Sequence, residues 1–323
     1  MKETAMATVF LVCILNINAL DNLHFNVGGN GYASGIEGHF GISGLQMKET
    51  VYADSADNNL LSEIDWNMGL QVAAGMKLSV EPADPFKKTG FSLGGMLLWY
   101  FPVNDRSMKD SDWDDNGNLY GYGESLASAL SGMEAEGRIA VHFPLRNKYL
   151  VTLAAQAWYY RYAVVAHDGW IGMAGSGERI PLYGAAVEYI QEWLIIAPCL
   201  DIRQRINRNT FGIRAAISPL IWGYHIDNHY FRTFEDGDPD QKYTTYTDIT
   251  RGGIFYQIQG DWIVNITPSV QAGITINYRV IENSRGDTTI TTAGLADYSF
   301  FYQGMAGAAV TIIGLDLTIR TTL

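Results

Sequence analysis

Residues 62–80 read SEIDWNMGLQVAAGMKLSV, a stretch in which apolar side chains alternate with polar or small ones. The apolar members of this alternation are Ile64, Trp66, Met68, Leu70, Val72 and Ala74. Successive side chains of a β-strand point to opposite faces, so a period of two is typical of a strand with one apolar face. The stretch therefore predicts a long β-strand.

Similar extended segments fill the rest of the chain. With residues 62–80 there are ten: residues 34–52, 62–80, 89–101, 130–143, 149–166, 182–205, 210–230, 248–266, 270–282 and 298 into the tail. Short turns at 81–88 and 144–148 alternate with long loops, which are the polar segments 102–124, 231–247 and 283–294 and the Gly-rich segment 167–181. An even number of strands, with short turns at one end and long loops at the other, is typical of outer-membrane barrels. We predict an all-β fold, a transmembrane antiparallel β-barrel of ten strands with long extracellular loops; the alternative is a soluble sandwich or barrel.

The composition agrees with a membrane barrel. Only 17% of the 323 residues are charged, against about 25% in ordinary soluble proteins. The net charge of −12 offers no basic face to neutralise phosphates, which excludes a nucleic-acid partner. No apolar run in the sequence reaches the roughly 20 residues that a membrane-spanning helix needs.

The first 19 residues resemble a secretory signal peptide. Lys2 provides a short basic start, Ala5–Ile17 is the apolar core and Ala19 ends a small-residue cleavage site. Residues 20–323 are then a single barrel domain. Loss of the signal peptide removes Cys13 and leaves Cys199 as the one cysteine, which excludes an intramolecular disulfide and suggests a structural role for Cys199.

Two short acidic motifs are candidates for chemistry. In Asp227-Asn-His229 the acid and the imidazole share one face of an extended strand, so the carboxylate can orient the ring and stabilise its protonated form. Asp110-Ser-Asp112 is a second pair with the same spacing, in the predicted loop 102–124. The strand pattern places both pairs on the long-loop side of the barrel. If they face each other, the chain has a base, its orienting acid and two acids that could hold a water molecule.

Other interpretations of these residues stay open. Each acidic motif alone is also typical of a solvated loop. His225 and His229 share a face and could hold a metal, and the acidic run Asp110–Asp115 could bind calcium. Ser125 could be a nucleophile with a distant histidine, although no glycine elbow surrounds it.

Several motifs, in this order, resemble those of the omptins, outer-membrane endopeptidases of Gram-negative bacteria. They are Gly41–Tyr52 followed by Ser62–Trp66, Asp110-Ser-Asp112-Trp113, Glu124-Ser125, Gly177-Glu-Arg179, Asp227-Asn-His229-Tyr230 and Gly294–Phe300. None of these motifs is specific alone; their shared order and the ten-strand pattern carry the resemblance.

The resemblance implies a catalytic groove at the extracellular top of an outer-membrane barrel, where exposed peptides or proteins are cleaved. His229 would be the general base and Asp227 its orienting partner, while Asp110 and Asp112 would hold the attacking water. This mechanism needs neither a metal nor a covalent intermediate. We expect a monomer surrounded by outer-membrane lipid.

The chain also departs from the family pattern. Omptins favour basic residues at the cleavage site, which acidic groups in the groove recognise; Glu49 matches one of these groups, but His225 occupies the place of the other. Of the strand motif that binds lipopolysaccharide in the family, only Arg161 is in place, so dependence on lipopolysaccharide as a cofactor stays open. The rival function is a non-enzymatic barrel that acts as an adhesin or surface-binding protein. A passive porin is disfavoured, because side chains fill the lumen of a ten-stranded barrel.

Overall fold

The computed structural model describes residues 31–53, 59–230, 243–293 and 299–322. These residues form one antiparallel sheet of thirteen strand segments: β1 (Tyr32–Tyr52), β2 (Leu60–Pro82), β3 (Gly90–Pro102), β4 (Arg106–Trp113), β5 (Leu119–Leu145), β6 (Tyr149–Met173), β7 (Ile180–Ile206), β8 (Asn209–Ser218), β9 (Ile221–His229), β10 (Tyr243–Arg251), β11 (Ile254–Asn265), β12 (Val270–Ala293) and β13 (Ser299–Thr322). The predicted signal peptide, residues 1–19, lies outside the described residues. None of the described residues forms a helix long and apolar enough to cross a membrane.

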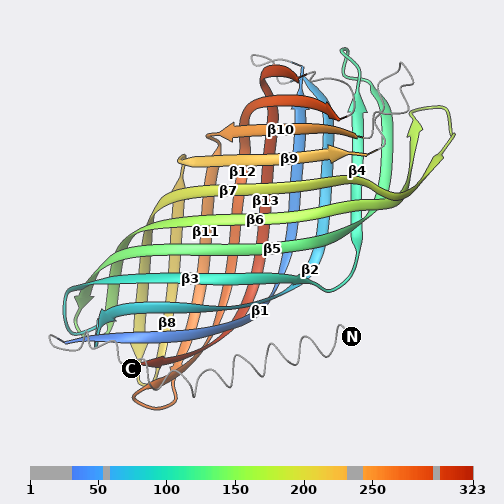
Figure 1. Ribbon diagram of the computed structural model, residues 1–323. Helices are drawn as coiled ribbons and strands as arrows, with labels where there is room; N and C mark the ends of the chain where they lie inside the picture. Colours follow the sequence, from blue (N-terminus) through green and yellow to red (C-terminus); the bar gives the residue numbers. More distant parts are fainter. Residues whose placement is uncertain (1–30, 54–58, 231–242, 294–298, 323) are drawn as a thin grey trace.

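The thirteen segments make a closed ring of ten wall strands (Figure 1). Three wall strands are each broken into two pieces. Segments β3 and β4 both lie between β2 and β5, β8 and β9 both pair with β7, and β10 and β11 both pair with β12. Antiparallel pairing of β1 with β13, from Gly35↔Thr322 to Val51↔Ala306, closes the ring. The predicted ten-stranded antiparallel barrel is confirmed.

Three of the predicted long loops are wrong, because most of their residues belong to strands. Residues 102–124 contain β4 and the start of β5, residues 167–181 continue β6 to Met173, and residues 283–294 continue β12 to Ala293. These strand ends mix polar, glycine and scattered apolar residues and therefore lack the regular alternation by which a half-buried strand is recognised. Asp110 and Asp112 consequently lie in strand β4, not in a loop.

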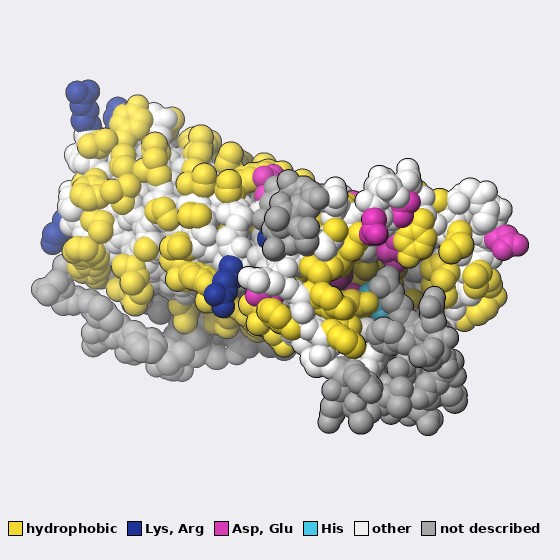
Figure 2. All heavy atoms as spheres, turned by 90° about the horizontal axis from the view of Figure 1, so that it is seen from above, with side chains coloured by type: hydrophobic (Ala, Val, Ile, Leu, Met, Phe, Trp, Pro, Cys, Tyr) yellow, Lys and Arg dark blue, Asp and Glu magenta, His cyan; other side chains and the backbone are white. Residues whose placement is uncertain are grey.

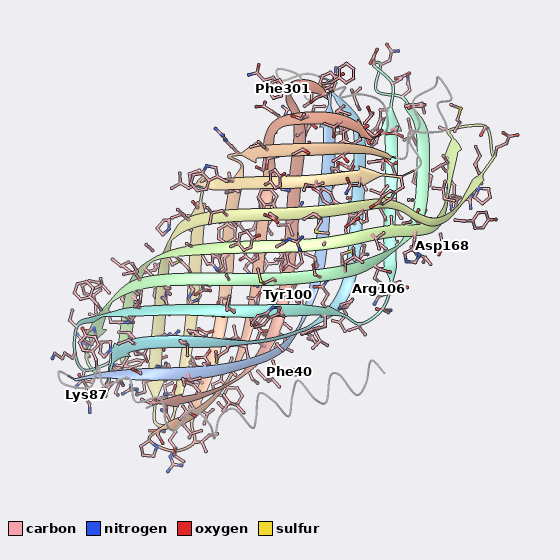
Figure 3. All side chains as sticks on the ribbon, in the orientation of Figure 1. Phe40, Lys87, Tyr100, Arg106, Asp168 and Phe301 are labelled. Atoms are coloured by element: carbon pink, nitrogen blue, oxygen red, sulfur yellow. The ribbon has the colours of Figure 1, made fainter. Side chains whose placement is uncertain are left out.

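The two ends of the barrel differ. At the short-turn end, β5 and β6 are joined through Arg146 and Asn147, both with positive φ (54° and 56°), as a tight type I′ hairpin requires. The strands continue well beyond the barrel wall at the other, long-hairpin end. Lys87 and Asp168 mark these opposite ends in Figure 3.

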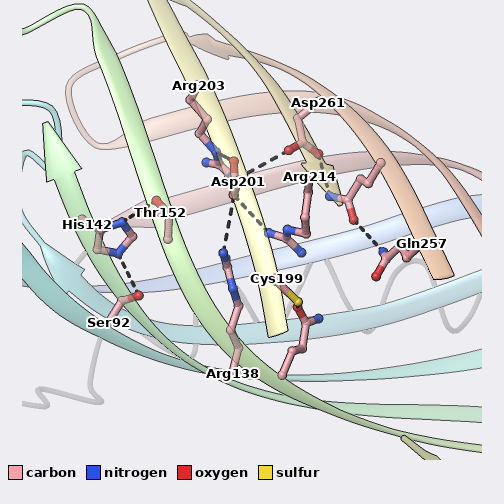
Figure 4. Close-up of polar contacts among 12 residues, drawn as sticks. Ser92, Arg138, His142, Thr152, Cys199, Asp201, Arg203, Arg214, Gln257 and Asp261 are labelled. Carbon is pink, nitrogen blue, oxygen red and sulfur yellow. Dashed lines mark hydrogen bonds and ion pairs between the residues drawn. The ribbon is translucent and has the colours of Figure 1, made fainter. Parts of the chain in front are cut away.

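The half of the barrel nearer the short turns, called here the lower half, is apolar outside and polar inside. Outward side chains such as Phe91, Leu93, Ile139 and Ile213 are 61–66% exposed, and Figure 2 shows the apolar side chains in rows over this part. Inside, Asp201 is surrounded by arginines, as Figure 4 shows: Arg203 at 3.1 Å, Arg138 at 3.5 Å and Arg214 at 3.6 Å. An apolar exterior of this kind suits a lipid environment.

The half nearer the long hairpins, called here the upper half, has a different interior. Its interior contains a buried aromatic core, in which Trp66 stacks on Tyr189 with ring centroids 5.8 Å apart. The change occurs on β2 at Gly69, where φ is +57° and the register against β1 shifts. The predicted single apolar face of residues 62–80 is therefore wrong: Ile64, Trp66 and Met68 face inward, whereas Leu70, Met76 and Leu78 face outward. A β-bulge exchanges the two faces of a strand in this way.

Candidate active site

The candidate residues lie above the apolar band of the barrel. At the height of Glu49 the outer face carries Lys48, which forms ion pairs with Glu63 at 2.9 Å and Asp65 at 3.4 Å. On the far wall, Arg161 pairs with Glu192 at 3.0 Å on the outer surface. Charged groups of this kind belong in water or among headgroups, so the inward-facing residues at these heights are outside the lipid-covered segment.

Asp227 and His229 project from β9 into the upper half and contact each other. Their spacing of two residues puts both side chains on the inner face of the strand. His229 Nε2 bonds to Asp227 Oδ2, and both side chains are buried, 5% and 2% exposed. The edge of Tyr246 on β10 packs against the His229 ring at 5.2 Å. The pair is thus held rigidly, with the imidazole Nδ1 as the ring nitrogen that does not bond to Asp227.

Glu49 reaches the Asp227–His229 pair from the other side of the barrel. It lies on the inner face of β1, 4% exposed, and its carboxyl is in hydrogen-bonding contact with that of Asp227. Burial raises the pKa of Glu49 well above its ordinary value, and the nearby charges of Asp227, Asp248 and Asp110 act in the same direction. Glu49 is therefore a carboxyl group that resists ionisation.

Asp248 is a further buried acid of this cluster that sequence reasoning missed. It is 4% exposed and lies on β10 directly opposite His225 of β9. Burial raises its pKa to about 7, and the charge of Asp227 contributes to the shift. The available signal was the alternation of Thr244, Asp248 and Thr250 on one face, which was hidden because the segment before residue 248 was interpreted as a loop.

His225 is enclosed by aromatic rings. Its ring lies 4.7 Å from Trp193 and 6.2 Å from Tyr189, and Nε2 bonds to Thr250 Oγ1 at 3.0 Å. The side chain is 1% exposed, and burial lowers its pKa to about 3. His225 is accordingly a neutral imidazole at physiological pH.

Asp110 and Asp112 lie on the same face of β4, between β2 and β5. Asp110 is level with Ile64 and Gly123, and Asp112 with Ser62 and Gly121. The charge of Asp110 acts on Glu49, so Asp110 belongs to the same acidic group as Asp227. Asp112 lies two residues further along β4, towards the long-hairpin end. A Cβ at Gly121 would lie 3.1 Å from the Asp112 carboxylate, so the glycine leaves room for this side chain.

The other candidates lie apart from this cluster. Ser125 is buried on β5 against Gly169 of β6. Arg161 lies on the outer surface, where it also donates to Ser131 Oγ at 3.2 Å. Cys199 is buried and donates to Gln156 Oε1 at 3.3 Å. No group of three or more His, Cys, Asp or Glu that could hold a metal occurs among the described residues.

A second Ser–His–Asp series is present on the outside of the upper half. Ser128 Oγ lies 2.8 Å from His167 Nε2, and His167 Nδ1 lies 3.0 Å from Asp168 Oδ2. Ser128 also donates to Asp105 at 2.5 Å, and Asp168 accepts a hydrogen bond from the backbone N–H of Gly184. These contacts tie the exposed strand ends together and form a polar surface network.

Comparisons with known proteins concern the family and the fold of the whole chain. The profile of the Omptin family matches residues 36–319. Among solved structures, the outer membrane protease OmpT from Escherichia coli is similar with a TM-score of 0.78 and 16% sequence identity, over 90% of this chain and 97% of that one. The transport unit of the autotransporter AIDA-I from Escherichia coli has a TM-score of 0.32 at 9% identity, over 94% of this chain and 96% of that one.

No curated protein sequence matches the chain. The OmpT likeness establishes the fold, and the AIDA-I score carries no argument. The family profile extends over almost the whole barrel, from within β1 to near the end of β13. The chain belongs to the omptin family.

Proposed function

We propose that the protein is an outer-membrane endopeptidase that cleaves exposed peptides or proteins with an activated water molecule. The observation that carries the proposal is the buried Asp227–His229 contact, at the end of the barrel where the strands project into solvent. Family membership and the described likeness to an outer membrane protease support it. The long-hairpin end then faces the extracellular side.

In this mechanism His229 is the general base. Asp227 accepts a hydrogen bond from Nε2–H, which leaves Nδ1 to take a proton from water. The negative charge of Asp227 stabilises the imidazolium that forms. The ring then returns the proton to the leaving amine, so protons balance over one cleavage. No metal and no acyl-enzyme are involved.

Asp110 and Asp112 are the proposed partners of the water on the opposite wall. Their carboxylates would accept hydrogen bonds from the water and orient its lone pair towards the scissile carbonyl. The charge of Asp110 already acts on the acidic group around Asp227, which supports a groove with acids on both walls. The role of Asp112 rests on its place beside Asp110 on β4.

Substrate and lipid contacts are the remaining parts of the proposal. Glu49 and His225 are the predicted substrate-binding residues, and both side chains are buried, at 4% and 1% exposure. Arg161 is the predicted contact for an anionic lipid such as lipopolysaccharide, and its exposed position on the outer wall is compatible with that role. Whether activity depends on the lipid is part of the test.

The test is cleavage of a peptide library by the refolded protein, with and without lipopolysaccharide. His229→Ala and Asp110→Ala should each abolish cleavage while the barrel still folds, and Ser125→Ala should retain it. Cut positions would reveal the residue preference. Absence of cleavage under every lipid condition, or cleavage that survives both substitutions, would favour a non-enzymatic surface-binding barrel.

A further inference from the structure

Glu49 and Asp227 meet across the interior of the barrel although their strands are not neighbours in the ring. Strand β1 lies between β2 and β13, and β9 lies between β7 and β10. The two walls are in contact at this height, as the stack of Trp66 of β2 on Tyr189 of β7 shows. Gln191 Nε2 of β7 also donates to the carbonyl oxygen of Ala309 on β13 at 3.4 Å. The contact between the two acids is therefore part of a packed cross-lumen interface.

The two carboxyl groups complete each other's hydrogen bonding only if they share a proton. Asp227 Oδ2 bonds to His229, while Asp227 Oδ1 and Glu49 Oε2 are buried and have no other partner among the described residues. Two carboxylates in contact repel each other and accept hydrogen bonds without donating one. A proton on Glu49 removes the repulsion and supplies the missing donor.

The surroundings keep that proton on Glu49. The groups that face it are Asp227 and His229 of β9, Asp248 of β10, Asp110 of β4 and Tyr189 of β7. The ion pairs among the described residues include none between Glu49 and a lysine or arginine: Lys48 points to the outer face, and Arg285 of β12 stacks on Tyr52 at 3.8 Å. Asp227, in contrast, has the imidazole of His229 as a hydrogen-bond donor.

We propose that Glu49 is a positioning residue, a neutral carboxylic acid that donates a hydrogen bond to Asp227 Oδ1 and so leaves Oδ2 for His229. The inference rests on the proposed peptidase function and assigns Glu49 to a series Glu49–Asp227–His229 rather than to direct contact with substrate. With both oxygens occupied, Asp227 has one orientation, and the imidazole Nδ1 points towards the groove. Ionisation of Glu49 removes the donor and adds a repelling charge beside Asp227.

The test compares Glu49→Gln with Glu49→Ala in the refolded full chain. The glutamine amide still donates to Asp227, so kcat should stay within about threefold of the wild type, whereas alanine leaves a buried carboxylate oxygen without a partner and should lower kcat about tenfold or more. KM should change little in either variant. Glu63→Gln, at the same height on the outer face, is the matched control and should leave both constants unchanged.

The pH profile gives a second readout. In the wild type, kcat should fall as the pH rises through the elevated pKa of Glu49, because the donor is lost on ionisation. Glu49→Gln cannot ionise and should lack this alkaline fall. Infrared difference spectra of the two proteins near neutral pH should show one protonated carboxyl group lost in the glutamine variant.

Three results would overturn the proposal. One is a glutamine variant as slow as the alanine variant; another is a rise in KM for basic peptides in both, which would make Glu49 a substrate contact. The third is an unchanged protonated-carboxyl band in Glu49→Gln. If the wild type cleaves nothing, the proposed peptidase function fails, but the hydrogen-bonded series can still be tested. The series predicts that the infrared band of the protonated carboxyl is lost in Glu49→Gln. It also predicts that the His229 imidazole resonance shifts in Glu49→Ala and not in Glu49→Gln.

Discussion

Both halves of the barrel bury carboxyl groups, but only the lower half neutralises them. Asp201, 1% exposed, has three arginines around it, and Glu134, fully buried, bonds to Arg279 at 2.6 Å and to Tyr100 at 2.6 Å. In the upper half Glu49, Asp227 and Asp248 are buried to a similar degree. The ion pairs among the described residues include none between these three acids and a lysine or arginine.

This difference indicates that the buried acids of the lower half stabilise the fold, whereas those of the upper half serve chemistry. Removing a carboxylate from water is costly unless a partner offsets the loss. The lower-half acids Asp201 and Glu134 have such partners, and their ion pairs connect different strands of the barrel wall. The acids of the upper half retain this cost, and burial keeps the pKa values of Glu49 and Asp248 raised, a property expected of groups that transfer protons.

The largest effect should follow from His229→Ala. If the buried acids of the upper half serve chemistry, loss of the base should lower kcat by about 10²–10⁴-fold while the barrel still folds. His167→Ala is the control, because His167 bonds to an aspartate on the outer surface and should retain activity. Equal losses in both variants would contradict the division between the two clusters.

Asp201→Asn tests the buried acid of the lower half, where we expect a loss of stability and not of activity. It leaves three buried guanidinium groups around a neutral amide, so the free energy of unfolding should fall by about 3–5 kcal/mol, measured by urea titration of the refolded barrel. Asp65→Asn removes a half-exposed acid from the outer face and should cost under about 1 kcal/mol. A stable Asp201→Asn barrel would show that the arginines need no acid between them.

Asp248→Asn should stabilise the upper half, and the gain should depend on pH. Its folded pKa of about 7 is above the ordinary value for aspartate, so between about pH 4 and 7 the folded protein binds more protons than the unfolded chain. Wild-type stability then falls as the pH rises through this window, and the asparagine variant lacks that fall. Urea midpoints of the two proteins should agree near pH 4 and differ most above pH 7; a constant difference would contradict the burial of a neutral Asp248.

The smallest effect concerns the boundary between the halves. Gly69 has φ +57°, and a Cβ there would run into the side chain of Arg106. Gly69→Ala should therefore lower the free energy of unfolding by about 1–2 kcal/mol. Gly137→Ala is the control, since nothing lies within 4 Å of a Cβ at that position and its φ is not positive. Equal costs would mean that the bulge is not strained by a side chain.

The part of the barrel that could be predicted from the sequence is the part whose strands have one regularly apolar face. The lipid-covered strands were predictable because one face is apolar, and the ten-stranded ring followed. The projecting strands were hidden, since β4 and the start of β5 mix charged, polar and glycine residues with a few apolar ones and show no regular alternation. The exchange of faces at Gly69 was also hidden, because Trp66 and Leu70 remain in phase in the sequence while they point to opposite sides.

The candidate site was predictable within one strand and unpredictable between strands. Spacing placed Asp227 beside His229, and the structure has them in contact. No pattern could show that Glu49 of β1 would touch Asp227 of β9, because the contact crosses the lumen between walls that are not paired. Asp248 was missed for a related reason: its neighbour His225 lies opposite it in the sheet, not near it in the sequence.

The stack of Trp66 on Tyr189 also determines where reaction products can go. The stack lies across the interior of the barrel, between the acidic cluster around Asp227 and the polar cavity of the lower half. Under the proposed function, a peptide fragment released at the acidic cluster therefore leaves on the long-hairpin side, from which the substrate entered. A protein that works in this proposed way alters molecules outside the barrel and does not import them.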